Sequence, residues 1–204
     1  MEAFRTFTAV AAPYYFPDVD TDKIIPHRFL RKPLSAGYRN FLFYNERYTP
    51  EGAAKPFILH DAPYDKAGIL VAGSNFGCGS TREGAVYALA DFGFRAVIAP
   101  SFSDIFQSNC LQNGVLPVVL AEDVVALLAQ QAEQQPGAVV TIDLPEQLVT
   151  TPDGRQHTFS IDASRKAQLL QGLDDIGITL TEAAAIDDFE RDYHRRLPWL
   201  KMAN

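Results

Sequence analysis

The clearest pattern in this chain is an alternation of short apolar runs and amphipathic stretches between residues 67 and 137. Each apolar run is short and continuous, which is typical of strands that are buried on both faces of a sheet. The runs are AGILVAG, RAVIAPS and VLPVVL, and the helical stretches that follow them are TREGAVYALADFG, SFSDIFQSNCLQNG and AEDVVALLAQQAEQQPG. This alternation predicts an α/β fold with at least some parallel pairing between its strands.

The pattern is less regular on both sides of this region. Prolines interrupt the first third repeatedly, and we interpret that third as irregular. Further on, AVVTIDLPEQLVTT and RQHTFSI are separated by Pro152-Asp153-Gly154, which predicts a β-hairpin near the C-terminal third. Two helical stretches follow, ASRKAQLLQGL and EAAAIDDFERDYHRRL, and we interpret the charges of the second as a solvated helix face. No internal repeat or long linker is visible, so a single domain over residues 1–204 is the economical interpretation.

Composition and charge narrow the possible classes of protein. The formal net charge is −7 and no basic stripe is present, so a nucleic-acid partner is not expected. No apolar run reaches the ~18 residues of a membrane helix, and the N-terminus lacks the features of a signal peptide. Two cysteines, Cys78 and Cys110, are too few for a disulfide framework, an iron–sulfur cluster or a structural zinc site on this chain alone. We therefore expect a cytoplasmic protein with no metal of its own and no membrane partner.

A glycine-rich stretch, GSNFGCGSTREG at residues 73–84, lies between the first of these strands and the helix after it. Such a position suits an anion, because bare backbone and the amides of a helix N-terminus can approach it. The stretch is not a P-loop, since Ser80 stands where the lysine belongs, and the G-x-G-x-x-G and G-x-S-x-G motifs are also missing. Arg82 remains, and its planar guanidinium suits a carboxylate.

Two structural alternatives compete for the polar residues of this stretch. Ser80-Thr81-Arg82-Glu83 matches a capping box, in which Ser80 caps the helix and Glu83 reaches back to it. Local sequence alone favours this cap over a catalytic role. Cys78 lies near a helix start, where a thiolate would be favoured, but the sequence offers it no obvious histidine partner. Passive packing or redox sensitivity is therefore favoured over a nucleophilic role for Cys78.

An acidic and basic segment, DVDTDKIIPHRFLRK, begins at Asp18. Its alternate aspartates resemble the start of a calcium loop, but Lys23 replaces the required glycine and Phe29 the required glutamate. In an extended segment the aspartates would project on one side and orient cationic groups, but local sequence alone slightly favours a solvated loop. The basic residues that could meet an anionic substrate are His27, Arg28, Arg31 and Lys32.

Three segments together carry a resemblance to a known family: NFGCGSTREGAVYALADFGFRAVIAPSFSDIF, DVDTDKIIP and GLDDIGITL. They resemble the small-subunit family of bacterial 3-isopropylmalate dehydratase, in the aconitase superfamily, over nearly the whole chain. The resemblance implies a single swivelling β/β/α domain, with a mixed or parallel sheet core flanked by helices, that closes over a large subunit. It implies a 4Fe-4S cluster on that partner, no cofactor on this chain, and activity only in a heterodimer or higher heteromer. The implied reaction converts 2-isopropylmalate to 3-isopropylmalate, a small dicarboxylate, by dehydration and rehydration in leucine biosynthesis.

The resemblance also implies roles for residues of the glycine-rich stretch. Matched to the aconitase-type Gly-Ser-Ser-Arg motif, Ser80 is expected to be the catalytic base, Thr81 a hydrogen-bond donor and Arg82 the clamp on a substrate carboxylate. The backbone of Gly77, Cys78 and Gly79 is expected to form the supporting loop. The chain departs from the commonest motif form, S-S-R-E-H, because Thr81 replaces the second serine and Gly84 replaces the histidine.

The same resemblance extends to the segment that begins at Asp18. Asp22 matches the aspartate of the superfamily's TDH segment and is expected to be catalytic. Lys32, the best match by spacing, and Arg31 are expected to bind substrate, with Arg28 as another candidate.

Other functions stay open at this point. One is the small subunit of a homoaconitase- or citraconate-type hydro-lyase, which would differ in substrate only. A second, of another class, is a stand-alone anion- or nucleotide-binding module that uses the glycine-rich stretch and needs no partner. The missing P-loop lysine counts against it. A hydrolase that depends on Cys78 is the third.

Overall fold

The computed structural model describes residues 1–79 and 82–200 of the chain. Its centre is a seven-stranded sheet with the strand order β4-β3-β2-β1-β5-β6-β7. The strands are β1 (Thr6–Tyr14), β2 (Ile69–Ala72), β3 (Ala96–Ala99), β4 (Leu116–Val119), β5 (Val139–Asp143), β6 (Leu148–Thr150) and β7 (Gln156–Thr158). Strands β1 to β4 pair in parallel, whereas β5 to β7 extend the sheet by antiparallel pairing. The mixed sheet confirms the predicted α/β fold class.

The prediction that the first third is irregular is wrong for β1, a central strand. Residues 6–10 pair antiparallel with β5, and residues 11–14 pair in parallel with β2. The amide of Ala11 still donates to Ala138 on the β5 side. The nitrogen of Pro13 faces the same side two residues further on, where no strand pairs with β1. Because this proline has no N–H to donate, it fits there without the loss of a hydrogen bond between strands.

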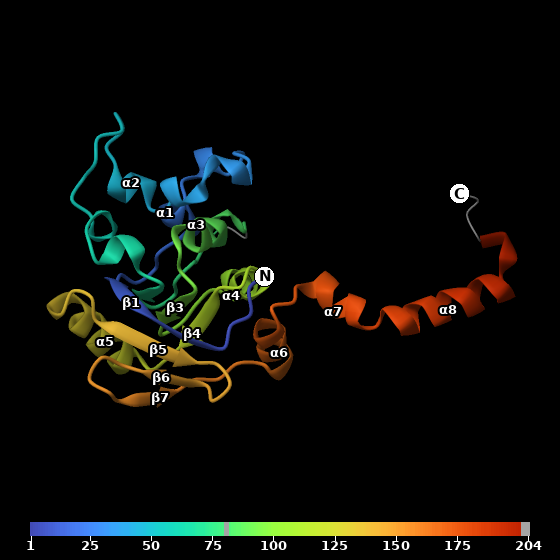
Figure 1. The fold of residues 1–204 in the computed structure, drawn as a ribbon. Coiled ribbons are helices and arrows are strands. Elements are labelled where there is room, and N and C mark those ends of the chain that lie inside the picture. Colours follow the sequence, from blue (N-terminus) through green and yellow to red (C-terminus); the bar gives the residue numbers. More distant parts are fainter. Residues whose placement is uncertain (80–81, 201–204) are drawn as a thin grey trace.

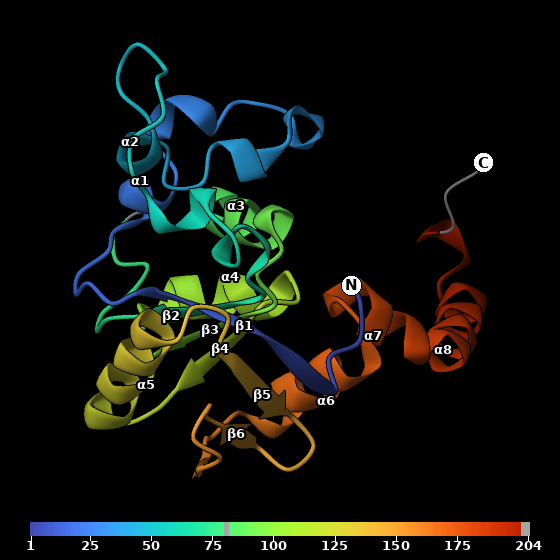
Figure 2. The same ribbon diagram turned by 60° about the vertical axis from the view of Figure 1, so that its left-hand side comes forward.

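Helices cover both faces of the sheet, as Figures 1 and 2 show. The α-helices are α1 (Thr21–Ile24), α2 (Tyr44–Arg47), α3 (Gly84–Phe92), α4 (Asp104–Gln112), α5 (Glu122–Gln134), α6 (Ala163–Gln171), α7 (Asp175–Thr181) and α8 (Ala183–Arg196). Short 3-10 turns lie at His27–Phe29, Leu34–Ala36, Tyr38–Asn40, Ile58–His60, Tyr64–Lys66 and Pro198–Leu200.

Two hydrophobic cores lie on opposite faces of the sheet, because successive side chains of a strand point to opposite sides. Leu70 of β2 faces the core formed with α3 and α4. Its neighbours Ile69 and Val71 face the core formed with α5 and α6. Strands buried on both faces explain why the predicted apolar runs are continuous rather than alternating.

The three strands and three helices predicted between residues 67 and 137 are confirmed. Asn113 caps the C-terminus of α4, and Gly114 after it has a φ of +74°, which is typical of the glycine that ends a helix. The predicted hairpin is confirmed only for β6 and β7. The long run before it folds as two strands, because Asp143 accepts a hydrogen bond from the amide of Glu146 at 2.9 Å and turns the chain.

The C-terminal residues 175–200, which we call the C-terminal arm, extend away from the sheet after α6 (Figures 1 and 2). No residue of α7 or α8 is buried. Within the part of the chain that the structure describes, no helix is both long and apolar enough to cross a bilayer.

Candidate functional site

The loop after β2, residues 73–79, is held between the loops that follow β1 and β3. On one side, the amide of Thr21 donates to the carbonyl of Cys78 at 2.9 Å. On the other, the Ser103 hydroxyl donates to the carbonyl of Gly77 at 2.6 Å. The carboxyl ends of neighbouring parallel strands lie at one edge of a sheet, where ligands bind in many α/β folds. The strand order therefore brings these loops together at a candidate site.

Close packing explains the bare backbone of this loop. Gly77 has a φ of +73°, and a Cβ there would lie 2.1 Å from the ring of Phe106. A Cβ on Gly73 would lie 2.4 Å from the carbonyl oxygen of Phe16. Gly79 also has a positive φ, of +93°, which favours glycine. Steric and conformational demands thus account for these glycines without a phosphate.

Cys78 is half-buried, and its surroundings do not favour a thiolate. Burial, followed by the negative charges of Asp20 and Asp18, raises the pKa of the Cys78 thiol. The expectation that a nearby helix start favours the thiolate is therefore wrong, because these effects outweigh it. Cys110 is fully buried, and burial raises the pKa of its thiol as well.

The alternate aspartates do not lie on one side of an extended segment, so that expectation is wrong. Asp20 caps α1, accepting a hydrogen bond from the amide of Lys23 at 2.6 Å. Asp18 accepts one from the side-chain amide of Asn75 at 2.7 Å. Asp22 lies instead in the first turn of α1 and is exposed. Among the described residues, no group of three or more His, Cys, Asp or Glu side chains could hold a metal ion.

Asp22 and Arg82 line one narrow pocket, which has no room for a water molecule. They come from different elements, α1 and the segment just before α3, and these helices are in contact. The rest of the lining is Thr21, Ile25, Leu30 and Ala85. Arg82 is exposed and forms no ion pair with another described residue, so its guanidinium is available to an anion.

Leu30 is a lining residue that sequence reasoning missed. A Cβ on Gly84 would lie 2.4 Å from Cδ2 of Leu30, so the glycine leaves the space that this side chain fills. Gly84 thus makes room for the packing of Leu30 in this chain. The available signal was the apolar Leu30 directly before the charged Arg31.

Ser80 and Thr81, the predicted base and donor, lie outside the described residues. The capping-box alternative for Ser80 also falls on these residues and lies outside the described ones, while α3 begins at Gly84, directly after Glu83. The carboxylate of Glu83, which should reach back to the cap, instead accepts a hydrogen bond from the Tyr87 hydroxyl one turn ahead.

The structure does not bring the predicted cations into the pocket of Asp22 and Arg82. Arg31 and Lys32 are exposed beyond Leu30, and neither lines it. Arg28 lies in another cavity of about 510 Å³, whose further lining is Phe29, Tyr44, Asn45, Tyr48, Thr49, Pro50 and Lys55. There it donates to the side-chain oxygen of Asn45 at 2.7 Å.

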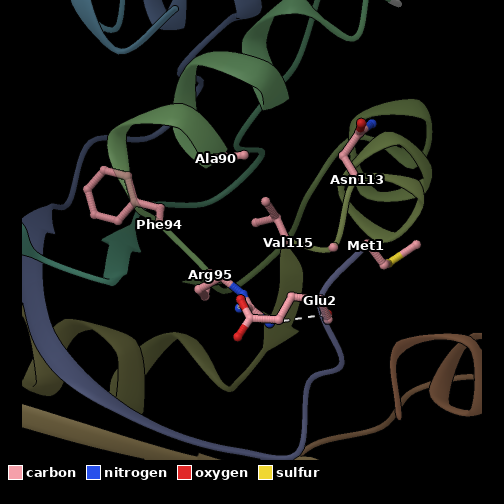
Figure 3. Close-up of a pocket in the computed structure, with 8 residues that line it drawn as sticks. Met1, Glu2, Ala90, Phe94, Arg95, Asn113 and Val115 are labelled. Atoms are coloured by element: carbon pink, nitrogen blue, oxygen red, sulfur yellow. Dashed lines mark hydrogen bonds and ion pairs between the residues drawn. The ribbon is translucent and has the colours of Figure 1, made fainter. Parts of the chain in front are cut away.

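A pocket at the opposite edge of the sheet, by the amino ends of β3 and β4, is shown in Figure 3. Its volume is about 180 Å³. Glu2 forms an ion pair with Arg95 there, so that this cation is already neutralised. We assign this pocket no role in the candidate site.

The class of protein to which this chain belongs follows from a family model. The sequence model described as the aconitase C-terminal domain matches residues 1–123, which include β1 to β4 and the candidate site. The mixed sheet and the site at its carboxyl edge therefore belong to an aconitase C-terminal, or swivel, domain. Two further models match the rest of the chain. One, described as LeuD_N, matches residues 126–163, and the other, described as the C-terminal domain of the 3-isopropylmalate dehydratase small subunit, matches residues 175–203.

Curated relatives and a solved structure agree with these matches. The small subunit of 3-isopropylmalate dehydratase from Rhodospirillum rubrum is 49% identical over 204 residues, covering 100% of this chain and 99% of the relative. The protein of the same name from Cereibacter sphaeroides is 48% identical over 201 residues, covering 98% and 100%. A crystal structure of 3-isopropylmalate dehydratase from Methanocaldococcus jannaschii has a TM-score of 0.64 at 26% identity, covering 91% of this chain and 99% of that one. The chain belongs to the 3-isopropylmalate dehydratase small-subunit family, which confirms the resemblance found in the sequence.

Proposed function

We propose that this chain works as the small subunit of a 3-isopropylmalate dehydratase. In this role it helps to convert 2-isopropylmalate to 3-isopropylmalate by dehydration and rehydration in leucine biosynthesis. The observation that carries the proposal is the near-complete match, at 48% and 49% identity, to small subunits of that name. Those relatives also favour this substrate over those of homoaconitase- or citraconate-type enzymes.

The candidate site supports the need for a partner. Its narrow pocket has no room for a water molecule, whereas common ligand pockets enclose roughly 300–1,000 Å³. A dicarboxylate bound at Arg82 would thus remain open to water on one side. A large subunit that covers this edge would complete the site, whereas a stand-alone binding module would have no such cover.

A 4Fe-4S cluster on the large subunit would supply a Lewis acid for the departing hydroxyl. The residues of this chain do not fit such a cluster themselves. It has two cysteines, and Cys110 is fully buried away from any ligand. We therefore assign the cluster to the partner and the handling of the proton and of the carboxylates to this chain.

The roles of this chain follow from the proton that must be removed. It lies next to a carboxylate, so its carbon is a weak acid and needs a base held in place and cations that match the growing charge. In our proposal Ser80 is the base, Arg82 binds a carboxylate through two parallel hydrogen bonds, and Thr81 donates a further one. The positive N-terminus of α3 and Arg82 favour the serine alkoxide.

Three residues in or near the pocket have supporting roles in the proposal. Asp22 shares the pocket with Arg82 and can orient the substrate hydroxyl or a water. Arg31 and Lys32 are exposed just beyond it, and can reach a second carboxylate when the partner closes the site.

Reconstitution tests the proposed function directly. The purified chain alone should show no turnover of 2-isopropylmalate, and addition of a cluster-loaded large subunit should restore it. Homocitrate-type substrates and citraconate, assayed on the same complex, should react more slowly. Activity of the lone chain, or preference for another dicarboxylate, would overturn the proposal.

Substitution of Ser80 tests its role as base. Ser80→Ala should abolish turnover by the reconstituted complex while leaving assembly intact. Ser160→Ala, at an exposed serine after β7, is the matched control and should keep normal turnover. Near-normal turnover by Ser80→Ala would remove the serine from the chemistry.

A further inference from the structure

The C-terminal arm leaves the body of the molecule without packing on the sheet. In both views it projects beyond α6 as two successive helices, α7 and α8 (Figures 1 and 2). Helix α8 packs chiefly against its own C-terminal turn, Pro198–Leu200. A helix of 14 residues is only marginally stable in water by itself, because nucleation is costly and tertiary packing normally supplies the stability. The arm therefore calls for a packing partner outside this chain.

One side of the arm is apolar, with helical spacing. Ile186, Phe189 and Tyr193 recur at intervals of three and four residues along α8, and Ile176 and Leu180 do so along α7. Phe189 is 63% exposed and Trp199, in the final turn, is 74% exposed. We call these side chains, together with Leu200, the apolar stripe. So many exposed large apolar side chains in one segment mark an interaction surface.

The arginines of the arm already form ion pairs within α8. Asp188 pairs with Arg191 at 2.8 Å, and Asp192 pairs with both Arg195 and Arg196. These pairs neutralise every arginine of the arm, while Glu182, Asp187 and Glu190 are exposed to solvent. The sequence-based interpretation of a solvated face is therefore right for the charged side, while it missed the apolar stripe on the other.

Area and charge indicate whether the partner of the apolar stripe is a second copy of this chain or another protein. Helices α7 and α8 have 7 and 14 residues, so they span about 32 Å at ~1.5 Å per residue, and half of such a cylinder exposes roughly 500 Å². A stable interface needs about 800 Å² from each partner. The arm carries six acidic residues and three arginines, a net charge of −3, so that two arms would repel each other. Pairing of two arms alone falls short on both counts.

A partner that already covers the body of this chain could also bind the arm, and the two contacts would form one continuous interface. The large subunit of the proposed function is such a partner, because it must close over the pocket of Asp22 and Arg82. The family matches point the same way. The aconitase C-terminal domain accounts for residues 1–123, whereas the arm matches the model described as the C-terminal domain of the 3-isopropylmalate dehydratase small subunit.

We propose that the C-terminal arm docks through its apolar stripe into an apolar groove of the large subunit and tethers the two chains. This inference rests on the proposed function for the identity of the partner. The tether lies outside the candidate site, so it contributes to assembly and not to the chemistry.

Affinity measurements on full-length chains test the tether. The dissociation constant of this chain for the cluster-loaded large subunit is compared for wild type, Phe189→Ala, Trp199→Ala and Asp188→Ala. The first two substitutions should weaken binding by at least about 30-fold each, as truncated aromatic anchors do. Asp188→Ala, on the charged side of the same helix, should change it by less than about fivefold. The unfolding midpoint of the free chain should stay constant in all of them, because the arm has no buried residue.

Each outcome of this experiment supports or overturns the tether. Unchanged affinity in both aromatic variants overturns it. A wild-type chain that is dimeric when free, and monomeric after Phe189→Ala, would assign the stripe to self-association and overturn it as well. If the wild-type chain binds the large subunit through the stripe but the complex does not turn over isopropylmalate, the proposed function fails and the tether stands.

Discussion

Gly77 offers a sharp test of how the candidate site is built, because two separate effects act on it. Its φ of +73° is left-handed, and a Cβ would lie 2.1 Å from the Phe106 ring. That ring cannot easily move aside, since it is 2% exposed and packs against the rings of Phe76 and Phe102. Gly77→Ala therefore introduces backbone strain and a steric clash together.

Matched controls separate the two effects. A left-handed non-glycine residue is disfavoured by roughly 1–2 kcal/mol, and overpacking of a core by roughly 1–3 kcal/mol. Gly77→Ala should thus lower the free energy of unfolding by about 2–5 kcal/mol. Gly154 has a similar φ of +81°, with nothing within 4 Å of a Cβ. Gly154→Ala should show the backbone effect alone, and the entropy change of the unfolded chain is common to both substitutions.

Urea unfolding of the free chain, followed by circular dichroism, measures the difference between the two variants. We expect Gly77→Ala to be less stable than Gly154→Ala by about 1–3 kcal/mol, the cost of overpacking. Adding Phe106→Leu should recover part of this difference in a double-mutant cycle. Equal losses in the two alanine variants would refute the argument that close packing requires Gly77.

Two further predictions concern the same edge of the sheet. Gly84→Ala places a Cβ 2.4 Å from the end of the flexible Leu30 side chain, which can rotate away, and alanine favours the helix by about 1 kcal/mol. Its free energy of unfolding should change by less than about 1 kcal/mol on that account, while the KM of the reconstituted enzyme shifts; a large loss of stability with an unchanged KM would contradict this. The raised pKa of Cys78 leaves less thiolate at a given pH, so iodoacetamide should alkylate it more slowly than a free thiol at pH 8 in a Cys110→Ala background. Asp20→Asn, which keeps the helix cap, should lower this pKa and speed the reaction, and no acceleration would contradict the charge argument.

Much of the fold was predictable because the central strands are buried on both faces. Their apolar runs stand out from the helices between them, and the parallel pairing follows from the alternation. Strand β1 was not recognised, since it contains alanines and Pro13, which disfavour a strand in isolation. The position of β1 in the sheet depends on pairing with β5, which lies more than a hundred residues further along the chain. The local sequence of β1 does not indicate that pairing.

The candidate site was predictable only in its polar residues. Arg82 and Asp22 stood out by residue type and by resemblance to the family, and the structure brings both to one pocket. Leu30 was missed because its importance arises from the space left by Gly84, a contact between distant parts of the sequence.

The divided pairing of β1 has a consequence for how this molecule opens. In the described residues, β5 to β7 connect to the rest of the sheet through the first half of β1 alone. Rupture of that one ladder would release the antiparallel strands as a group, while β2 to β4 kept their own bonds. Backbone amides in β5 to β7 should then exchange with solvent deuterium as one cooperative unit, separate from the strands that support the candidate site.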